Sequence, residues 1–264
     1  MAVSNVLKEQ PDHVQENHFS QNKPDRWSSV AILGFTLALV SVCAAVLSGL
    51  GYQLGWWHFR TGFVILRWAA YGGIVSAGVS IIGCLLTRPG SLRRGLTLSI
   101  IGLIAGLLVI GIPGVYWLRA QQVPPIHDIT TDTDNPPAFV AILLLRKDAP
   151  NPAEYGGPDI ASKQHEAYPD LAPLIVSLPP DKAFERALTE ARKLGWQIVD
   201  AKQAEGRIEA TDTTLWFGFK DDIVIRIISA NGGSRIDVRS VSRVGRSDVG
   251  TNAKRIRAFL RNIS

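Results

Sequence analysis

The first half of the chain contains three long apolar runs, and the second half alternates between short apolar and polar stretches. The runs cover residues 28–54, 62–87 and 95–118. Each run exceeds the roughly 20 residues that an α-helix needs to cross the hydrocarbon core of a bilayer. Between Arg26 and Arg119 the only charged side chains are five arginines. Because water-facing surface needs polar cover, this pattern predicts a three-helix transmembrane anchor over residues 28–118.

Arginines next to the runs predict the orientation of the anchor. The loop Arg88–Arg94 is the densest basic cluster near the runs, and short basic loops stay in the cytoplasm. The tail 1–27 is long and contains acidic residues, unlike the n-region of a secretory signal. We therefore expect a cytoplasmic N-terminus, a multi-pass anchor in a bacterial inner (plasma) membrane, and a C-terminal domain in the periplasm.

Few residues inside the runs suit transport. Arg67 lies about one and a half turns into the second predicted helix, close enough to the end to snorkel to the headgroups. Gly102 and Gly106 follow the Gly-x-x-x-Gly spacing, which favours close helix packing within one chain or between chains. Since the runs contain so few polar groups, a transporter is disfavoured.

Prolines concentrate after the third run. Residues 119–180 contain 11 of the 15 prolines, three times in pairs. Paired prolines exclude regular helix and central strand, so residues 119–180 are predicted to be a proline-rich linker and irregular lead-in. Phe139–Leu145 is an apolar run within it, short enough for one buried strand or one helical turn.

Regular patterns return in residues 181–264. Asp181 can cap a helix that ends near Gly195, and a last helix carries the apolar stripe Ile256, Phe259, Leu260 and Ile263. Between the helices lie four alternating segments, 196–201, 207–214, 222–229 and 235–244. Asn231-Gly232-Gly233 is a strong hairpin signal between the last two. The prediction is an α+β domain: helix, four-stranded antiparallel sheet, helix.

Charge and cysteine content exclude some functions. The formal net charge of +5 belongs mostly to the first half of the chain, so the pI near 9.4 does not indicate binding to nucleic acid. Cys43 and Cys84 both lie in the apolar runs, where they are interpreted as small buried hydrophobes and not as a disulfide or a metal pair. We expect no metal and no cofactor.

The best candidate site is the arginine-rich strand and turn before the last helix. Guanidinium groups and helix N-terminal amides that converge there would bind phosphate or carboxylate. The candidate ligand-binding residues are Arg239, Arg243, Arg246, Asp248, Asn252 and Arg255. In the alternative interpretation, Asp248 or Thr251 caps the helix and the arginines pair with carboxylates of the sheet. Those carboxylates are Glu209, Asp212, Asp221 and Asp222.

A second candidate is a set of possible metal ligands. It consists of His127 and Asp128, with Asp132, Asp134 and His165 as further ligands. Their spacing fits no zinc or calcium pattern, and aspartates before prolines are ordinary turn residues. No nucleophile elbow, zinc-protease motif or phosphate-binding loop occurs, so no catalytic residue is assigned.

Four segments of the second half resemble a known family. They are Ile126–Asp132, Asn135–Phe139, Ala167–Pro173 and Arg239–Ile256. Together they are similar to a bacterial and plastid family known only as a domain of unknown function, number fourteen ninety-nine, over about residues 124–264. The resemblance implies a small α+β domain, often tethered to a membrane, with no established substrate, cofactor or catalytic residues.

Two hypotheses about function remain. The favoured one is a non-enzymatic membrane protein whose outer domain binds an anionic ligand, a lipid headgroup or an envelope partner protein. The other is a membrane-tethered hydrolase that acts on a cell-envelope component through His127, Asp128 and the arginine cluster. The sequence does not indicate the oligomeric state.

Overall fold

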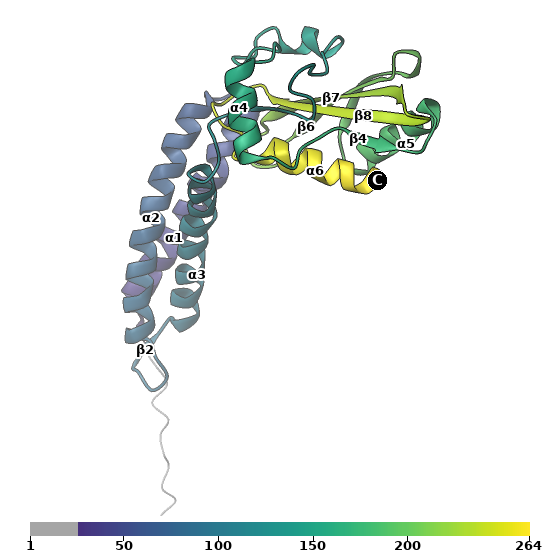
Figure 1. Ribbon diagram of the computed structural model, residues 1–264. Coiled ribbons are helices and arrows are strands. Elements are labelled where there is room, and N and C mark those ends of the chain that lie inside the picture. Colours follow the sequence, from purple (N-terminus) through teal and green to yellow (C-terminus); the bar gives the residue numbers. More distant parts are fainter. Residues whose placement is uncertain (1–25) are drawn as a thin grey trace, which may run out of the picture.

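The chain forms a helical bundle with a sheet-containing domain at one end, in a computed structural model that describes residues 26–264 (Figure 1). The predicted tail, 1–27, lies outside the described residues except for Arg26–Trp27, which form β1. β1 pairs in parallel with β2 (Arg93–Arg94). The start of the first helix and the loop Arg88–Arg94 therefore lie together, at the end of the bundle away from the domain.

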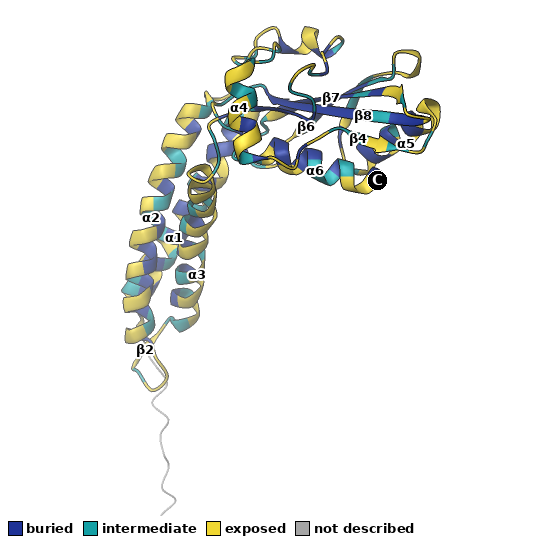
Figure 2. Ribbon diagram, in the orientation of Figure 1, coloured by how far each residue is buried: buried dark blue, intermediate teal, exposed yellow. Residues whose placement is uncertain are grey.

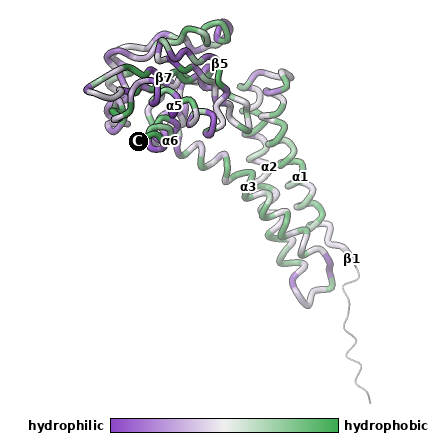
Figure 3. The backbone as a smooth tube through the Cα atoms, turned by 90° about the vertical axis from the view of Figure 1, so that its right-hand side faces the viewer, coloured by the Kyte–Doolittle hydropathy of each residue, from purple (hydrophilic) through white to green (hydrophobic). Residues whose placement is uncertain are grey.

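The bundle consists of α1 (Ser29–Gln53), α2 (Phe59–Leu86) and α3 (Leu96–Ala120). All three are long and apolar enough to cross a membrane. At 1.5 Å per residue they are about 37–42 Å long, against a hydrocarbon core of about 30 Å. Their outer surfaces are exposed and apolar (Figures 2 and 3). The predicted set of three long apolar helices is confirmed.

Small residues fill the inside of the bundle and set the distance between its helices. A Cβ atom on Gly73 would lie 3.0 Å from the carbonyl oxygen of Gly106, and one on Gly106 would lie 2.8 Å from that of Gly73. Ser76 Oγ donates to the carbonyl of Gly34, 3.0 Å away, and so links α2 to α1. Gly106 of the predicted small-residue pair thus contacts a helix of the same chain.

The domain is built on an antiparallel sheet with the strand order β3-β8-β7-β6-β5. The four predicted strands are present as β5 (Gln197–Lys202), β6 (Arg207–Thr213), β7 (Lys220–Ala230) and β8 (Gly233–Ser242). A short 3₁₀ turn, η2 (Gln203–Glu205), joins β5 to β6. Asn231 and Gly232 have φ of 47° and 78°, which matches a two-residue hairpin between the paired Ala230 and Gly233. The predicted hairpin is confirmed.

The sheet has two strands more than predicted. β3 (Asp128–Thr130) and β4 (Leu174–Val176) both pair with β8, one after the other along its free edge. Both strands come from residues 119–180, which also supply η1 (Ile142–Arg146) and α4 (Pro158–Ala167). The predicted lead-in is therefore irregular only in part, because its prolines fall between these short elements or, like Pro158, at the first position of a helix, where proline is tolerated. The α+β class is unchanged.

The two faces of the sheet differ in chemistry. α5 (Pro180–Lys193) and α6 (Thr251–Ile263) cover one face, over an apolar core in which Trp196 stacks on Phe259 at 5.2 Å between ring centroids. The predicted cap Asp181 lies in the first turn of α5; the N-cap position is Pro179, and no side chain there bonds to a helix amide. Residues 132–155 cover the other face, whose side chains are mostly charged. In Figures 1 and 3, α6 lies on the side of the sheet that faces the bundle.

Candidate functional site

The predicted anion-binding residues lie on both faces of the sheet. Arg239 and Arg243 are at odd positions of β8 and its extension, so their side chains lie on the charged face with Asp128 and Asp222. Asn252 and Arg255 belong to α6, which covers the opposite face. The structure therefore brings Arg239 and Arg243 to one side of the sheet, and Asn252 and Arg255 to the other.

Arg239 forms a buried pair with Asp128. Its Nε and Nη2 atoms donate to the two carboxylate oxygens at 2.9 and 2.7 Å, and Nη2 also donates to the carbonyl of Ala153. The guanidinium lies over the ring of Tyr155, 5.6 Å from its centroid. Burial raises the pKa of Asp128 despite the hydrogen bonds from Arg239. Burial and the nearby Asp128 carboxylate raise the pKa of Tyr155 to about 12.

Asp222 gathers three donors on the same face. Arg243 donates to both of its oxygens at 2.8 Å, Arg146 donates at 2.7 Å, and Thr211 Oγ1 donates at 2.7 Å. Burial alone would raise the pKa of Asp222, but these hydrogen bonds hold that pKa below its ordinary value. Because Arg146 lies in η1, this carboxylate also fastens the covering segment to β7.

Arg255 makes the corresponding links on the helical face. Its guanidinium donates to Asp212 at 2.9 and 2.7 Å, to Asp221 at 2.7 Å and to Ser240 Oγ at 3.1 Å. Asn252 is fully buried, accepts from Ser240 Oγ at 2.7 Å and donates to the carbonyl of His127 at 3.0 Å. These bonds tie α6 to β6, β7 and β8 and to His127, the residue before β3.

The turn before α6 is fixed by Asp248. Its carboxylate accepts from the amides of Gly250 and Asn252, both at 2.8 Å. Burial raises the pKa of Asp248, although these two amides lower it. Val249 has a φ of 54°, a left-handed conformation that is strained for a β-branched residue. The free amides at the start of α6, which would bind an anion, are thus used by this carboxylate.

The remaining candidates are spread out. Arg246 is exposed in the turn. The backbone carbonyl of His127 accepts hydrogen bonds from the amide of Ser242 and from the side chain of Asn252. His165 contacts Thr133 Oγ1 at 3.0 Å. Asp132 pairs with Arg226 and Arg235, and Asp134 is exposed. Within residues 26–264, no three His, Cys, Asp or Glu side chains are grouped to hold a metal ion.

Glu209 is a buried carboxylate that reasoning from the sequence considered only as a partner for the arginines. It accepts from the amides of Val140, Ala141 and Ile142 at 2.9, 3.1 and 2.8 Å, and it contacts Arg207. An acidic group at the start of η1 satisfies amides that have no partner within the helical turn. Three of the four carboxylates named for pairing, Asp212, Asp221 and Asp222, do accept from the candidate arginines.

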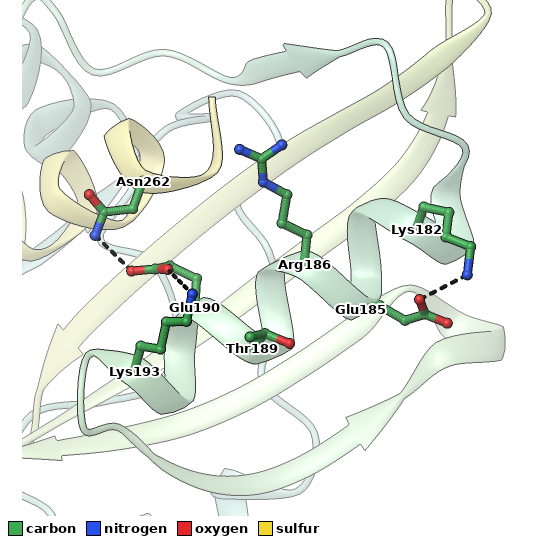
Figure 4. A pocket seen from close by; sticks show the side chains of 7 residues that line it. All are labelled: Lys182, Glu185, Arg186, Thr189, Glu190, Lys193 and Asn262. Atoms are coloured by element: carbon green, nitrogen blue, oxygen red, sulfur yellow. Dashed lines mark hydrogen bonds and ion pairs between the residues drawn. The ribbon is translucent and has the colours of Figure 1, made fainter.

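A polar hollow of about 400 Å³ lies between α5 and α6, on the outer side of the helical layer (Figure 4). Its lining consists of Lys182, Glu185, Arg186, Thr189, Glu190, Lys193 and Asn262. Lys182 pairs with Glu185 at 3.0 Å, and Asn262 donates to Glu190 at 2.7 Å. Arg186 donates to the carbonyl of Ser264 at 2.9 Å.

Basic side chains continue from this hollow along the outer side of both helices. We call the following set the basic helical face: Lys182, Arg186, Arg192, Lys193, Lys254, Arg257 and Arg261. Asp170 pairs with Arg257 at 2.6 Å, and the hydrogen bonds from Arg257 lower the pKa of this carboxyl. The sequence contained a signal for this face, since Lys254, Arg257 and Arg261 recur at helical spacing opposite the apolar stripe of α6.

A comparison with models of known protein families shows to which family the chain is related. A family model described as protein of unknown function (DUF1499) matches residues 128–263. The chain belongs to this family. The matched part of this DUF1499 member begins with β3 and ends with α6, so it covers the whole sheet and both helices on its face. No curated protein matches the chain.

Proposed function

We propose that this DUF1499 protein is a multi-pass protein of the bacterial inner (plasma) membrane, whose extracytoplasmic domain binds the anionic lipid headgroups of that membrane. The observation that carries the proposal is the position of α6. It lies on the bundle side of the sheet in two perpendicular views (Figures 1 and 3). Helices that cross the bilayer would therefore hold the basic helical face toward the membrane surface.

The chemistry of this face suits phosphate groups. Close to an anionic membrane surface each Lys or Arg contributes roughly 1 kcal/mol of attraction, which fades within a Debye length of about 10 Å at 0.1 M salt. The hollow between α5 and α6 adds Lys182, Arg186 and Lys193, whose ammonium and guanidinium groups donate charge-assisted hydrogen bonds to phosphate oxygens. The basic helical face thus combines attraction over a distance with one recessed place for a headgroup.

This proposal moves anion binding from the cluster around Arg239–Arg255 to α5 and α6, because Arg239, Arg243 and Arg255 are already paired with carboxylates. The alternative function, a membrane-tethered hydrolase acting on an envelope component, would use His127 and Asp128. Asp128 is buried, and both of its carboxylate oxygens accept hydrogen bonds from Arg239, so the geometry favours lipid binding over hydrolysis.

The proposal is tested on the full chain in lipid nanodiscs made of phosphatidylcholine alone or with phosphatidylglycerol added. Acetylation of Lys193 and Lys254 should slow when the anionic lipid is present. Lys147, which follows η1 on the opposite face, should react at the same rate in both. The double change Lys254→Ala with Arg261→Ala should remove the protection of Lys193, while Lys147→Ala should not. Equal rates for Lys193 and Lys254 in both kinds of disc would refute the proposal.

A further inference from the structure

The tip between β6 and β7, Thr214–Phe219, docks onto the ends of α1 and α2. The indole nitrogen of Trp216 donates to the carbonyl of Ala45 at 3.1 Å. Phe217 is buried beside Phe63, with 5.0 Å between ring centroids. The sheet therefore touches the bundle through aromatic side chains at one hairpin, in addition to the covalent link after α3.

Two glycines make room for this tip. A Cβ atom on Gly49 would lie 2.3 Å from the carbonyl oxygen of Trp216. A Cβ atom on Gly62 would lie 2.9 Å from the ring of Phe217 and 2.5 Å from the carbonyl oxygen of Ser48. Any larger residue at either position would push the tip away, so α1 and α2 form a socket that fits it.

Hydrogen bonds within the tip and from α1 satisfy the carbonyls of Thr214, Leu215, Trp216 and Phe219. Gln53 Nε2 donates to the carbonyls of Leu215 and Trp216 at 3.0 and 2.8 Å. Thr214 and Phe219 close the turn, because the amide of each donates to an oxygen of the other at 2.9 Å. Carbonyl groups near acyl chains need such partners within the protein, because no water is there to bond them.

Leu215 points away from the protein and is 96% exposed. The contact of its neighbour Trp216 with Ala45 lies eight residues before the end of α1, about 12 Å along the helix. Around that level α1 exposes Val46 and Leu47, a surface suited to lipid. The tip therefore reaches the depth at which the bundle itself is apolar.

We propose that Thr214–Phe219 is inserted into the leaflet on the domain side. Leu215 and the indole of Trp216, whose nitrogen reaches the level of Ala45, lie on the acyl-chain side of the boundary with the headgroups, close to which tryptophan concentrates. The occupant of the surface around Leu215 is thus the bilayer. The tip fixes the domain to the bundle and the membrane together, and this inference holds whether or not the basic helical face binds headgroups.

The test places one nitroxide spin label at a time on the full chain in phosphatidylcholine liposomes. Cys43 and Cys84 are first replaced by Ala, and Leu215→Cys, Val46→Cys or Asn231→Cys is added. Asn231 lies in the β7–β8 turn and serves as the reference for water, and Val46 serves as the reference for lipid. The accessibility of each label to oxygen, which dissolves in acyl chains, is divided by its accessibility to a water-soluble nickel chelate.

The ratio at Leu215 should match the ratio at Val46. A ratio equal to that at Asn231 would overturn the proposal. The socket is tested by adding Gly49→Leu to the Leu215 label, with Gly78→Leu as the matched control because a Cβ there meets nothing within 4 Å. Gly49→Leu should shift the ratio toward water and Gly78→Leu should leave it unchanged. An unchanged ratio in Gly49→Leu would show that insertion does not depend on the socket.

Discussion

At the scale of single residues, this domain uses arginine as a link between elements far apart in the sequence. Arg146 joins η1 to β7 through Asp222 and also donates to the carbonyls of Val241 and Asn151. Arg255 joins α6 to β6 and β7. A planar group with five donors can serve several acceptors at once. The carboxylates of Asp221 and Asp222 are buried. Asp222 keeps Arg243 when Arg146 is removed, whereas removing Arg255 leaves the desolvated carboxylate of Asp221 without its partner.

Arg255→Gln should destabilise the domain by about 3–5 kcal/mol, because Asp221 would stay buried without a counter-charge. Arg246→Gln is the matched control, since Arg246 is exposed and surface changes usually stay within about 0.5 kcal/mol. The measurement is hydrogen exchange of the slowest β7 and β8 amides in the full chain in detergent. Unchanged exchange in Arg255→Gln, together with slower exchange on adding sulfate, would instead support an anion site at Arg255.

Acid should destabilise the domain partly through Asp222. The pKa of Asp222 is lower in the folded state than its ordinary value of 3.8. A carboxyl of this kind stabilises the fold above its ordinary pKa, and that contribution is lost as the pH falls from there through the folded pKa. Asp222→Asn should lower the free energy of unfolding at neutral pH and flatten its fall below about pH 4. A fall as steep as that of the unchanged protein would exclude this role for Asp222.

At the scale of elements, η1 depends on one carboxylate of the sheet. Glu209→Gln would place an amide nitrogen, itself a donor, against the backbone amides of residues 140–142. We expect faster hydrogen exchange across 139–146 than in the unchanged protein, whereas Glu205→Gln, which alters an exposed carboxylate next to Arg207, should have no such effect. Protection of 139–146 that survives Glu209→Gln would show that Phe139 and Ile142 hold the segment by packing alone.

The elements predicted from the sequence are those with a strong apolar signal. The three long helices are apolar on all sides over more than 20 residues, whereas the β5–β8 meander and α6 each carry a repeating apolar face. α4 lacks one, because its buried anchor is Gln164, which pairs with both the amide and the carbonyl of Thr130. β3 and β4 contribute three residues each, too few for alternation to appear. They form strands because each pairs with a different part of the long strand β8.

The candidate site was predictable only in part, because a pattern within one element does not show where another element packs. Arg239 and Arg243 lie on one face of the sheet, as their odd-numbered positions along one strand require. This alternation could not place α6, so Asn252 and Arg255 were grouped with residues that lie across the sheet from them. The acidic partners of the arginines were named from composition, but a partner from the lead-in, Asp128, was assigned to another site.

At the scale of the whole molecule, the domain and the bundle contact each other at two places. The chain after α3 leads into β3, and the aromatic tip of β6–β7 sits between α1 and α2. Two connections of this kind resist rotation of the domain better than one flexible linker. The basic helical face is consequently presented in a fixed orientation, as binding to the surface of the same membrane requires.

We predict that residues 124–264 fold without the bundle, since the core between the sheet and α5 and α6 lies within them. Neither a metal nor a disulfide should be needed. Removing the bundle exposes Trp216 and Phe217, so the fragment should self-associate, and Trp216→Ser with Phe217→Ser should make it monomeric in analytical ultracentrifugation. Unfolding on addition of a chelator would contradict this prediction and point back to His127 and Asp128.

The orientation of the chain in the membrane is the last prediction. The loop Arg88–Arg94 and the domain lie at opposite ends of the bundle (Figure 1), so they face opposite sides of any membrane that the helices cross. Arginines in short loops are retained in the cytoplasm, so we predict that the domain lies outside. A reporter active only after export should therefore be active when fused after Ser264 and inactive when inserted at Gly90.

Replacing Arg88, Arg93 and Arg94 together by Asn should weaken this preference for one orientation, whereas Arg60→Asn on the other side should strengthen it. Export-dependent activity at Gly90 in the unchanged protein would reverse the topology and place the basic helical face against the inner leaflet.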